Sequence, residues 1–135
     1  MKTLIVEDVQ FLGMILERIV EPYSMVEFAK DGSEAIDMFS KAVVKNEPYD
    51  LIFLDLLMPK IDGFEVLFHV RKFEDDFNLD ADKKSKIIVV STFSDAENVT
   101  KARKAGCDGY IIKPYRKDKV LEELRSLKLI PAEED

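Results

Sequence analysis

Five charged or polar side chains each follow directly after a short apolar run of the sequence. They are Glu7 and Asp8 after residues 4–6, Asp55 after residues 51–54, Ser91 after residues 87–90 and Lys113 after residues 110–112. A charge among apolar neighbours is costly to bury unless another group pairs with it. This regular placement indicates that the charged groups compensate one another in the folded chain.

Brought together, these groups have a definite chemistry. Two like unit charges about 4 Å apart repel by about 4 kcal/mol at an effective dielectric near 20, so three clustered carboxylates require protons or a cation. Carboxylates with open positions suit Mg²⁺, and a lysine beside them adds a fixed positive charge. Such a site stabilises a phosphoryl group, and an aspartate can accept one covalently. The residues therefore predict metal-assisted phosphoryl acceptance at Asp55.

The periodicity of apolar residues predicts the elements that would position these groups. Short apolar runs predict strands at residues 4–6, 25–29, 51–54, 87–90 and 110–112, with helical stripes at residues 11–20, 35–43, 64–70, 96–102 and 120–127 between and after them. Residues Ser94 to Glu97 match a capping box that would open the fourth helix. The acidic segment 72–84 is expected to be a solvated extension of the third helix and its loop.

Alternating strands and helices predict an α/β fold with a doubly wound, five-stranded parallel sheet in the order 2-1-3-4-5. The strand order reverses between strands one and three, and ligands of such sheets bind at the carboxyl ends of the strands beside this switch point. Asp55 is therefore expected to lie beside Glu7 and Asp8.

The sequence resembles the receiver domain of two-component response regulators, the CheY-like group, over residues 2–127. The motifs that carry the resemblance are Glu7-Asp8, Asp55 with Met58-Pro59 and Asp62-Gly63, Ser91, and the run from Gly109 to Pro114. The resemblance implies a flavodoxin-like fold and a stand-alone phosphoacceptor that catalyses only its own phosphorylation and dephosphorylation. Tyr115 stands where phenylalanine is frequent in this family, with no obvious consequence.

The resemblance also assigns roles. It implies that Asp55 accepts a phosphoryl group from a phosphohistidine of a sensor kinase or a phosphotransfer protein. It implies that Asp8 and Asp55 bind Mg²⁺ directly, that Glu7 binds it through water, and that the Leu57 carbonyl is a further ligand. It also implies that Lys113 pairs with the phosphoryl oxygens and that the Lys113-Pro114 bond is cis. Ser91 and Tyr110 would move as switch residues. The surface formed by the fourth helix, fifth strand and fifth helix would then bind an unknown protein target.

Other readings of these residues are open. Asp55 alone could be a turn residue, Tyr110 could be ordinary packing, and the fourth helix could be either poorly buried or a docking face. A haloacid dehalogenase-type phosphatase would need an aspartate pair after the first strand, and a flavin module would need a phosphate-binding loop there. A receiver-shaped module that is never phosphorylated is the principal alternative.

Length and composition limit the class of protein. The chain has 135 residues, 47% of them hydrophobic, a net charge of −7 and one cysteine. This charge argues against nucleic acid binding, and no apolar stretch approaches transmembrane length. We expect a cytoplasmic protein without membrane insertion, with a receiver domain at residues 1–128 and an acidic tail at residues 129–135.

Overall fold

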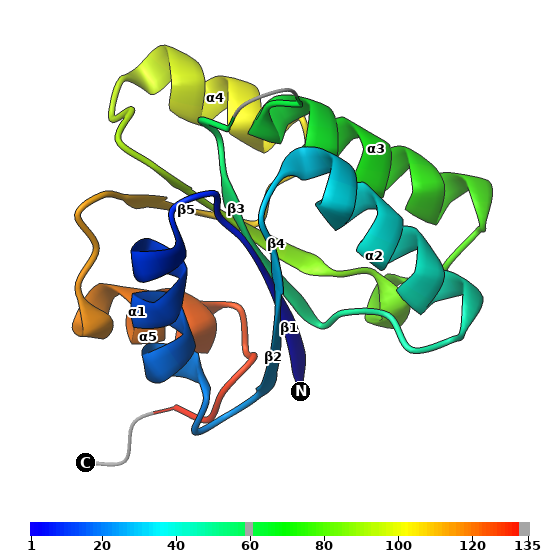
Figure 1. Ribbon diagram of the computed structural model, residues 1–135, viewed down its shortest axis with the longest axis horizontal. Helices are drawn as coiled ribbons and strands as arrows, with labels where there is room; N and C mark the ends of the chain where they lie inside the picture. Colours follow the sequence, from blue (N-terminus) through cyan, green and yellow to red (C-terminus); the bar gives the residue numbers. More distant parts are fainter. Residues whose placement is uncertain (59–60, 133–135) are drawn as a thin grey trace.

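The computed structural model describes residues 1–58 and 61–132, which form a central sheet between two layers of helices (Figure 1). The strands are β1 (Lys2–Val6), β2 (Met25–Ala29), β3 (Leu51–Asp55), β4 (Lys86–Ser91) and β5 (Gly109–Ile112). The helices are α1 (Gln10–Val20), α2 (Gly32–Val44), α3 (Gly63–Asp76), α4 (Ala96–Lys104) and α5 (Lys117–Ser126), with a 3₁₀ turn at Ala81–Lys83.

The sheet confirms the predicted topology. Its five strands run in the order β2-β1-β3-β4-β5, and every pair is parallel. The central strand β3 is buried along its whole length, as its uninterrupted apolar sequence requires. In the register, Val6 pairs with Leu54 and Asp55 with Val90, so the ends of β1, β3 and β4 lie at one edge of the sheet.

The two faces of the sheet are covered by different helices. Helices α1 and α5 lie on one face, and α2, α3 and α4 lie on the other (Figure 1). Alternate residues of each strand point to opposite faces, so Phe53 joins the core under α1 and α5, while Leu54 joins the core under the other three helices. Helix α4 buries only Ala102, so it is the least embedded of the five helices in the described residues.

Aspartates cap three of the helices, and the cap of α4 differs from the predicted one. Asp31 and Asp62 begin α2 and α3 by accepting backbone hydrogen bonds. Helix α4 begins in the same way at Asp95, whose carboxylate accepts from the Asn98 backbone N–H at 3.1 Å. The predicted capping box at Ser94 is therefore wrong by one residue, because a carboxylate is the stronger acceptor at the positive end of a helix.

An ionic network anchors the far end of α3. The Arg71 guanidinium donates to Glu74 at 2.7 Å, to Asp108 at 2.8 Å, and to the backbone carbonyls of Ser85 and Gly106 at 2.9 Å each. Glu74 is only 1% exposed. The prediction that residues 72–84 form a wholly solvated extension is therefore wrong at Glu74, which pairs with an arginine one turn earlier.

The packed part of the chain continues past α5. Leu129 packs against the core under α1 and α5, and Ile130 is buried in it. Residues 133–135 lie outside the described residues, so the predicted acidic tail remains a prediction. Among the helices described, none has both the length and the hydropathy needed to cross a membrane.

Candidate functional site

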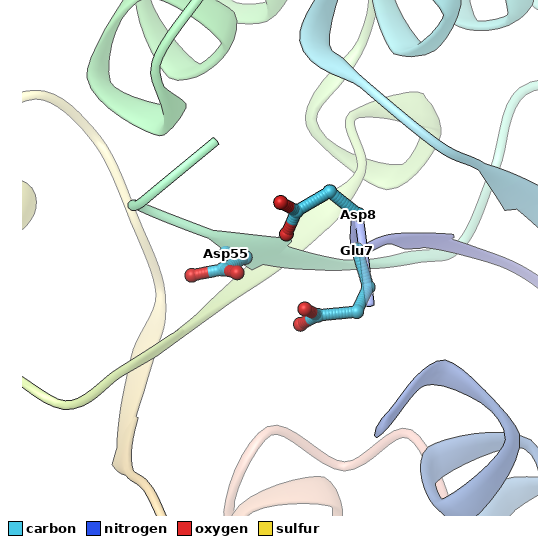
Figure 2. Close-up of side chains that lie close together, drawn as sticks. All are labelled: Glu7, Asp8 and Asp55. Atoms are coloured by element: carbon cyan, nitrogen blue, oxygen red, sulfur yellow. The ribbon is translucent and has the colours of Figure 1, made fainter. Parts of the chain in front are cut away.

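Three carboxylates meet at the edge of the sheet where β1 and β3 end. Glu7 and Asp8 follow β1, and Asp55 is the last residue of β3. Figure 2 shows the three side chains projecting into the same region, and one carboxylate oxygen of each lies within 4.8 Å of the others. Glu7 and Asp55 are buried, at 6% and 4% exposure, while Asp8 is exposed. The cluster is therefore accessible to solvent at Asp8 and largely shielded from it at the other two carboxylates.

Lys113 supplies a cation to this cluster. Its ammonium Nζ lies 3.2 Å from Glu7 Oε2 and 3.2 Å from Asp55 Oδ2. The lysine directly follows β5, and its backbone N–H donates to the Ser91 carbonyl at 2.7 Å. The peptide bond to Pro114 is cis, as predicted. One ammonium thus faces three carboxylates, which leaves an excess of negative charge when all of them are ionised.

The backbone also contacts the two buried acids. The Val9 N–H donates to Glu7 Oε1 at 3.3 Å, and the Leu57 N–H donates to Asp55 Oδ1 at 3.1 Å. Even so, burial raises the pKa of the Glu7 carboxyl to about 7, with a further increase from the nearby Asp55 carboxylate that Lys113 only partly offsets. The negative charge of Asp55, which favours a proton on Glu7, also favours binding of a metal ion at this cluster.

The donor set fits a hard divalent cation. Three carboxylates with an exposed member offer oxygen ligands and open positions, the arrangement that suits Mg²⁺. Leu57, whose carbonyl is the fourth predicted ligand, lies immediately beyond this cluster and is half exposed. Among the described residues, the acidic segment 72–84 contributes no such cluster.

Gly63 allows α3 to approach the acidic cluster closely. Its N–H donates to the Leu56 carbonyl at 3.1 Å. A Cβ at this position would lie 2.7 Å from the Cα of Leu56 and would also overlap the Asp55 carbonyl oxygen. A side chain here would displace the backbone that carries Asp55. The sequence motif Asp62-Gly63 pointed to this position without showing what it contacts, and Pro59 of the same motif lies outside the described residues.

Ser91 and Tyr110, the two predicted switch residues, contact a shared neighbour. The buried Ser91 hydroxyl accepts from the Phe93 N–H at 3.0 Å. The Tyr110 hydroxyl donates to the Phe93 carbonyl at 2.7 Å, and its ring is half-buried. Within the described part of the chain, no hydrogen bond joins Ser91 to Asp55. The two predicted switch residues are thus linked to one another through Phe93.

Comparison with known proteins identifies the family. Residues 3–125 match the model of the response regulator receiver domain. The chain belongs to this family. It is 32% identical to the chemotaxis protein CheY of Halobacterium salinarum over 124 residues, which covers 91% of this chain and 92% of that protein. The receiver family is a family of phosphoaccepting response regulators in two-component signalling, and this receiver domain is of the CheY type.

Two further comparisons place this receiver among relatives of different size. It is 31% identical over 121 residues to the osmosensing histidine protein kinase SLN1 of Saccharomyces cerevisiae, covering 88% of this chain but 9% of the kinase. Its fold matches the crystal structure of the CheX-CheY-BeF₃-Mg²⁺ complex from Borrelia burgdorferi with a TM-score of 0.79 and 26% identity, over 96% of this chain and 90% of that one. The chain thus spans nearly all of the CheY relatives and a small part of the kinase.

Proposed function

We propose that this chain is a stand-alone receiver that accepts a phosphoryl group on Asp55 from a phosphohistidine. The observation that carries the proposal is the position of Lys113, whose ammonium lies 3.2 Å from both Asp55 and Glu7 at the edge of the acidic cluster. A buried carboxylate with a fixed cation beside it offers both a nucleophile and a charge that stabilises the transferred group.

The transfer conserves atoms and charge in a single displacement. An Asp55 carboxylate oxygen forms a bond to phosphorus while the bond from phosphorus to the histidine nitrogen breaks, and the imidazole leaves with the electron pair. The Leu57 N–H holds one Asp55 oxygen at 3.1 Å, which orients the carboxylate. Lys113 pairs with the oxygens of the arriving phosphoryl group.

Asp8 and Asp55 would hold Mg²⁺ directly, with Glu7 acting through water and the Leu57 carbonyl as a further ligand. When bound, the metal neutralises charge that develops on the phosphoryl oxygens. The excess of carboxylates over ammonium groups supports this assignment, as does the presence of Mg²⁺ in the Borrelia burgdorferi CheY complex.

Phosphorylation would switch the surface formed by α4, β5 and α5. A new doubly charged group at Asp55 would draw the Ser91 hydroxyl toward it, and Tyr110 would move inward. The link through Phe93 supports coupled movement, because a shift of Ser91 breaks a contact of the same residue that holds the Tyr110 hydroxyl. The shallow packing of α4 supports it further.

The proposed partners are a histidine kinase or phosphotransfer protein upstream and a protein target downstream. The kinase relative carries a segment similar to this chain, and the Borrelia burgdorferi CheY is in complex with CheX. We propose that the protein works in the cytoplasm, binds no nucleic acid, inserts in no membrane and turns over no substrate besides its own phosphoryl group. The receiver domain is proposed to end near residue 128, with the packed residues Leu129 and Ile130 at this boundary.

A phosphohistidine donor tests this function directly. The purified protein is mixed with Mg²⁺ and a radiolabelled, histidine-phosphorylated kinase or phosphotransfer domain. We expect the label to move to this protein in an acid-stable, base-labile form, as an aspartyl phosphate requires. Failure of every donor tried, together with failure of acetyl phosphate, would favour the alternative of an interaction module that is never phosphorylated.

Mg²⁺ alone is expected to stabilise the fold. At a concentration ten times the Kd it should raise the free energy of unfolding by about 1.4 kcal/mol, because it binds only the folded cluster. Thermal denaturation with and without Mg²⁺ measures this. Asp8→Asn should remove the Mg²⁺ effect without destabilising the metal-free protein, because it relieves repulsion. Asp37→Asn, in an exposed pair with Lys41, is the matched control and should retain the full effect.

A further inference from the structure

A hydrogen bond joins the segment that carries Lys113 to the start of α1. The Tyr115 hydroxyl donates to the Leu12 carbonyl at 2.7 Å, across 103 positions of the sequence. Tyr115 lies two residues after Lys113, and Leu12 lies in the first turn of the helix that follows Glu7 and Asp8. The bond therefore links the segment that carries the Lys113 ammonium to the segment that carries the Glu7 and Asp8 carboxylates.

The Leu12 end of this bond is rigidly connected to Glu7. The Leu12 and Gly13 N–H groups both donate to the Val9 carbonyl, at 3.0 and 3.2 Å. Val9 in turn donates its N–H to Glu7 Oε1 at 3.3 Å. The Tyr115 hydroxyl is thus attached to the same short turn that holds the Glu7 carboxylate in place.

The Lys113 segment is held on both sides of the lysine. On one side the Lys113 N–H donates to the Ser91 carbonyl at 2.7 Å, and on the other the Tyr115 side chain reaches α1. The Tyr115 ring packs against the core under α1 and α5. Burial, with the nearby Glu7 and Asp55 carboxylates, holds the pKa of its hydroxyl above the usual range, so the group stays a neutral donor.

We infer that Tyr115 is a positioning residue for phosphoryl acceptance: its hydroxyl holds the Lys113 segment against α1 so that the ammonium stays between Glu7 and Asp55. This inference rests on the proposed function of Asp55. A phenylalanine at this position would keep the ring in the core but lose the link to Leu12. The lysine would then occupy its position 3.2 Å from both carboxylates for a smaller fraction of the time.

The first test compares rates of phosphorylation by acetyl phosphate with saturating Mg²⁺. Tyr115→Phe is expected to lower the maximal rate about threefold to tenfold while the half-saturating acetyl phosphate concentration changes little. Tenfold corresponds to about 1.4 kcal/mol, the size of a typical net hydrogen bond. Tyr49→Phe is the matched control, since its hydroxyl also makes one bond, to Glu27 at 2.8 Å, at the opposite end of β3. An unchanged rate in Tyr115→Phe, or an equal loss in both variants, overturns the inference.

The second test does not depend on phosphorylation. The unfolding equilibrium constant of the metal-free protein is measured by urea denaturation for Tyr115→Phe, Lys113→Met and the double variant. If the hydroxyl acts through Lys113, Tyr115→Phe changes this constant less in the Lys113→Met background than in the wild type. Equal changes in both backgrounds overturn the inference. If the wild type fails to accept a phosphoryl group, the proposed function is wrong. The unfolding measurements on these variants then decide by themselves whether Tyr115 positions Lys113.

Discussion

Replacing Lys113 with methionine is expected to slow phosphorylation of Asp55 by acetyl phosphate about 100- to 1000-fold, the loss typical of removing one preorganised charge-stabilising donor. The ammonium is the cation that contacts Asp55 among the described residues, at 3.2 Å, and only 13% of its side chain is exposed. Methionine keeps most of the length and the apolar character of the lysine stem, so the change removes chiefly the charge.

The same substitution is also expected to destabilise the metal-free protein. Removing one partner of a buried ion pair typically costs about 3–5 kcal/mol. Here we expect about 1–3 kcal/mol, because the Glu7 carboxyl, with its pKa raised to about 7, can take up a proton when the lysine is gone. Time courses by intact mass and urea unfolding measure the two effects. Lys41→Met, at an exposed position of α2, should change neither. A normal phosphorylation rate in Lys113→Met would contradict the role of the ammonium.

The largest loss of stability is expected at Arg71, far from the phosphorylation chemistry. Arg71→Met should lower the free energy of unfolding by about 3–5 kcal/mol, because Glu74 would remain buried without its cation. This is a large share of the roughly 5–15 kcal/mol that stabilises a typical domain. The guanidinium also joins Ser85, which directly precedes β4, to Gly106 and Asp108, which lie just before β5.

Urea denaturation of three variants separates the buried charge from lost packing. Arg71→Met/Glu74→Met should recover part of the loss, since both charges are then absent and neither is left unpaired. Arg18→Met, at an exposed position of α1, should stay within about 0.5 kcal/mol of the wild type. If Arg71→Met were no less stable than Arg18→Met, the network would have no stabilising role.

The sequence predicted those features that depend on local pattern. The sheet order follows from apolar runs separated by helical stripes, and the meeting of Glu7, Asp8 and Asp55 follows from the shared edge of parallel strands. Lys113 was predicted at the same edge because it follows β5, and the structure places it there.

The features that the sequence did not predict depend on contacts between distant residues. Asp108 is 37 positions from Arg71, and Leu12 is 103 positions from Tyr115, so no local pattern joins either pair. Glu74 lies in a run of acids that is typical of a solvated surface. Arg71 is only one helical turn away, but only the fold brings the Ser85 backbone to this pair and buries Glu74. At Asp95 the signal was present, but two adjacent residues could each cap the helix.

The most direct test of the central claim is the intact mass of the protein after incubation with Mg²⁺ and acetyl phosphate. We expect a gain of one phosphoryl group in the wild type and in Asp37→Asn, and no gain in Asp55→Asn or when Mg²⁺ is chelated. An equal gain in Asp55→Asn would place the phosphoryl group on another residue. No gain in the wild type, with a histidine-phosphorylated donor also inactive, would contradict phosphoryl acceptance and leave the acidic cluster as a metal site alone.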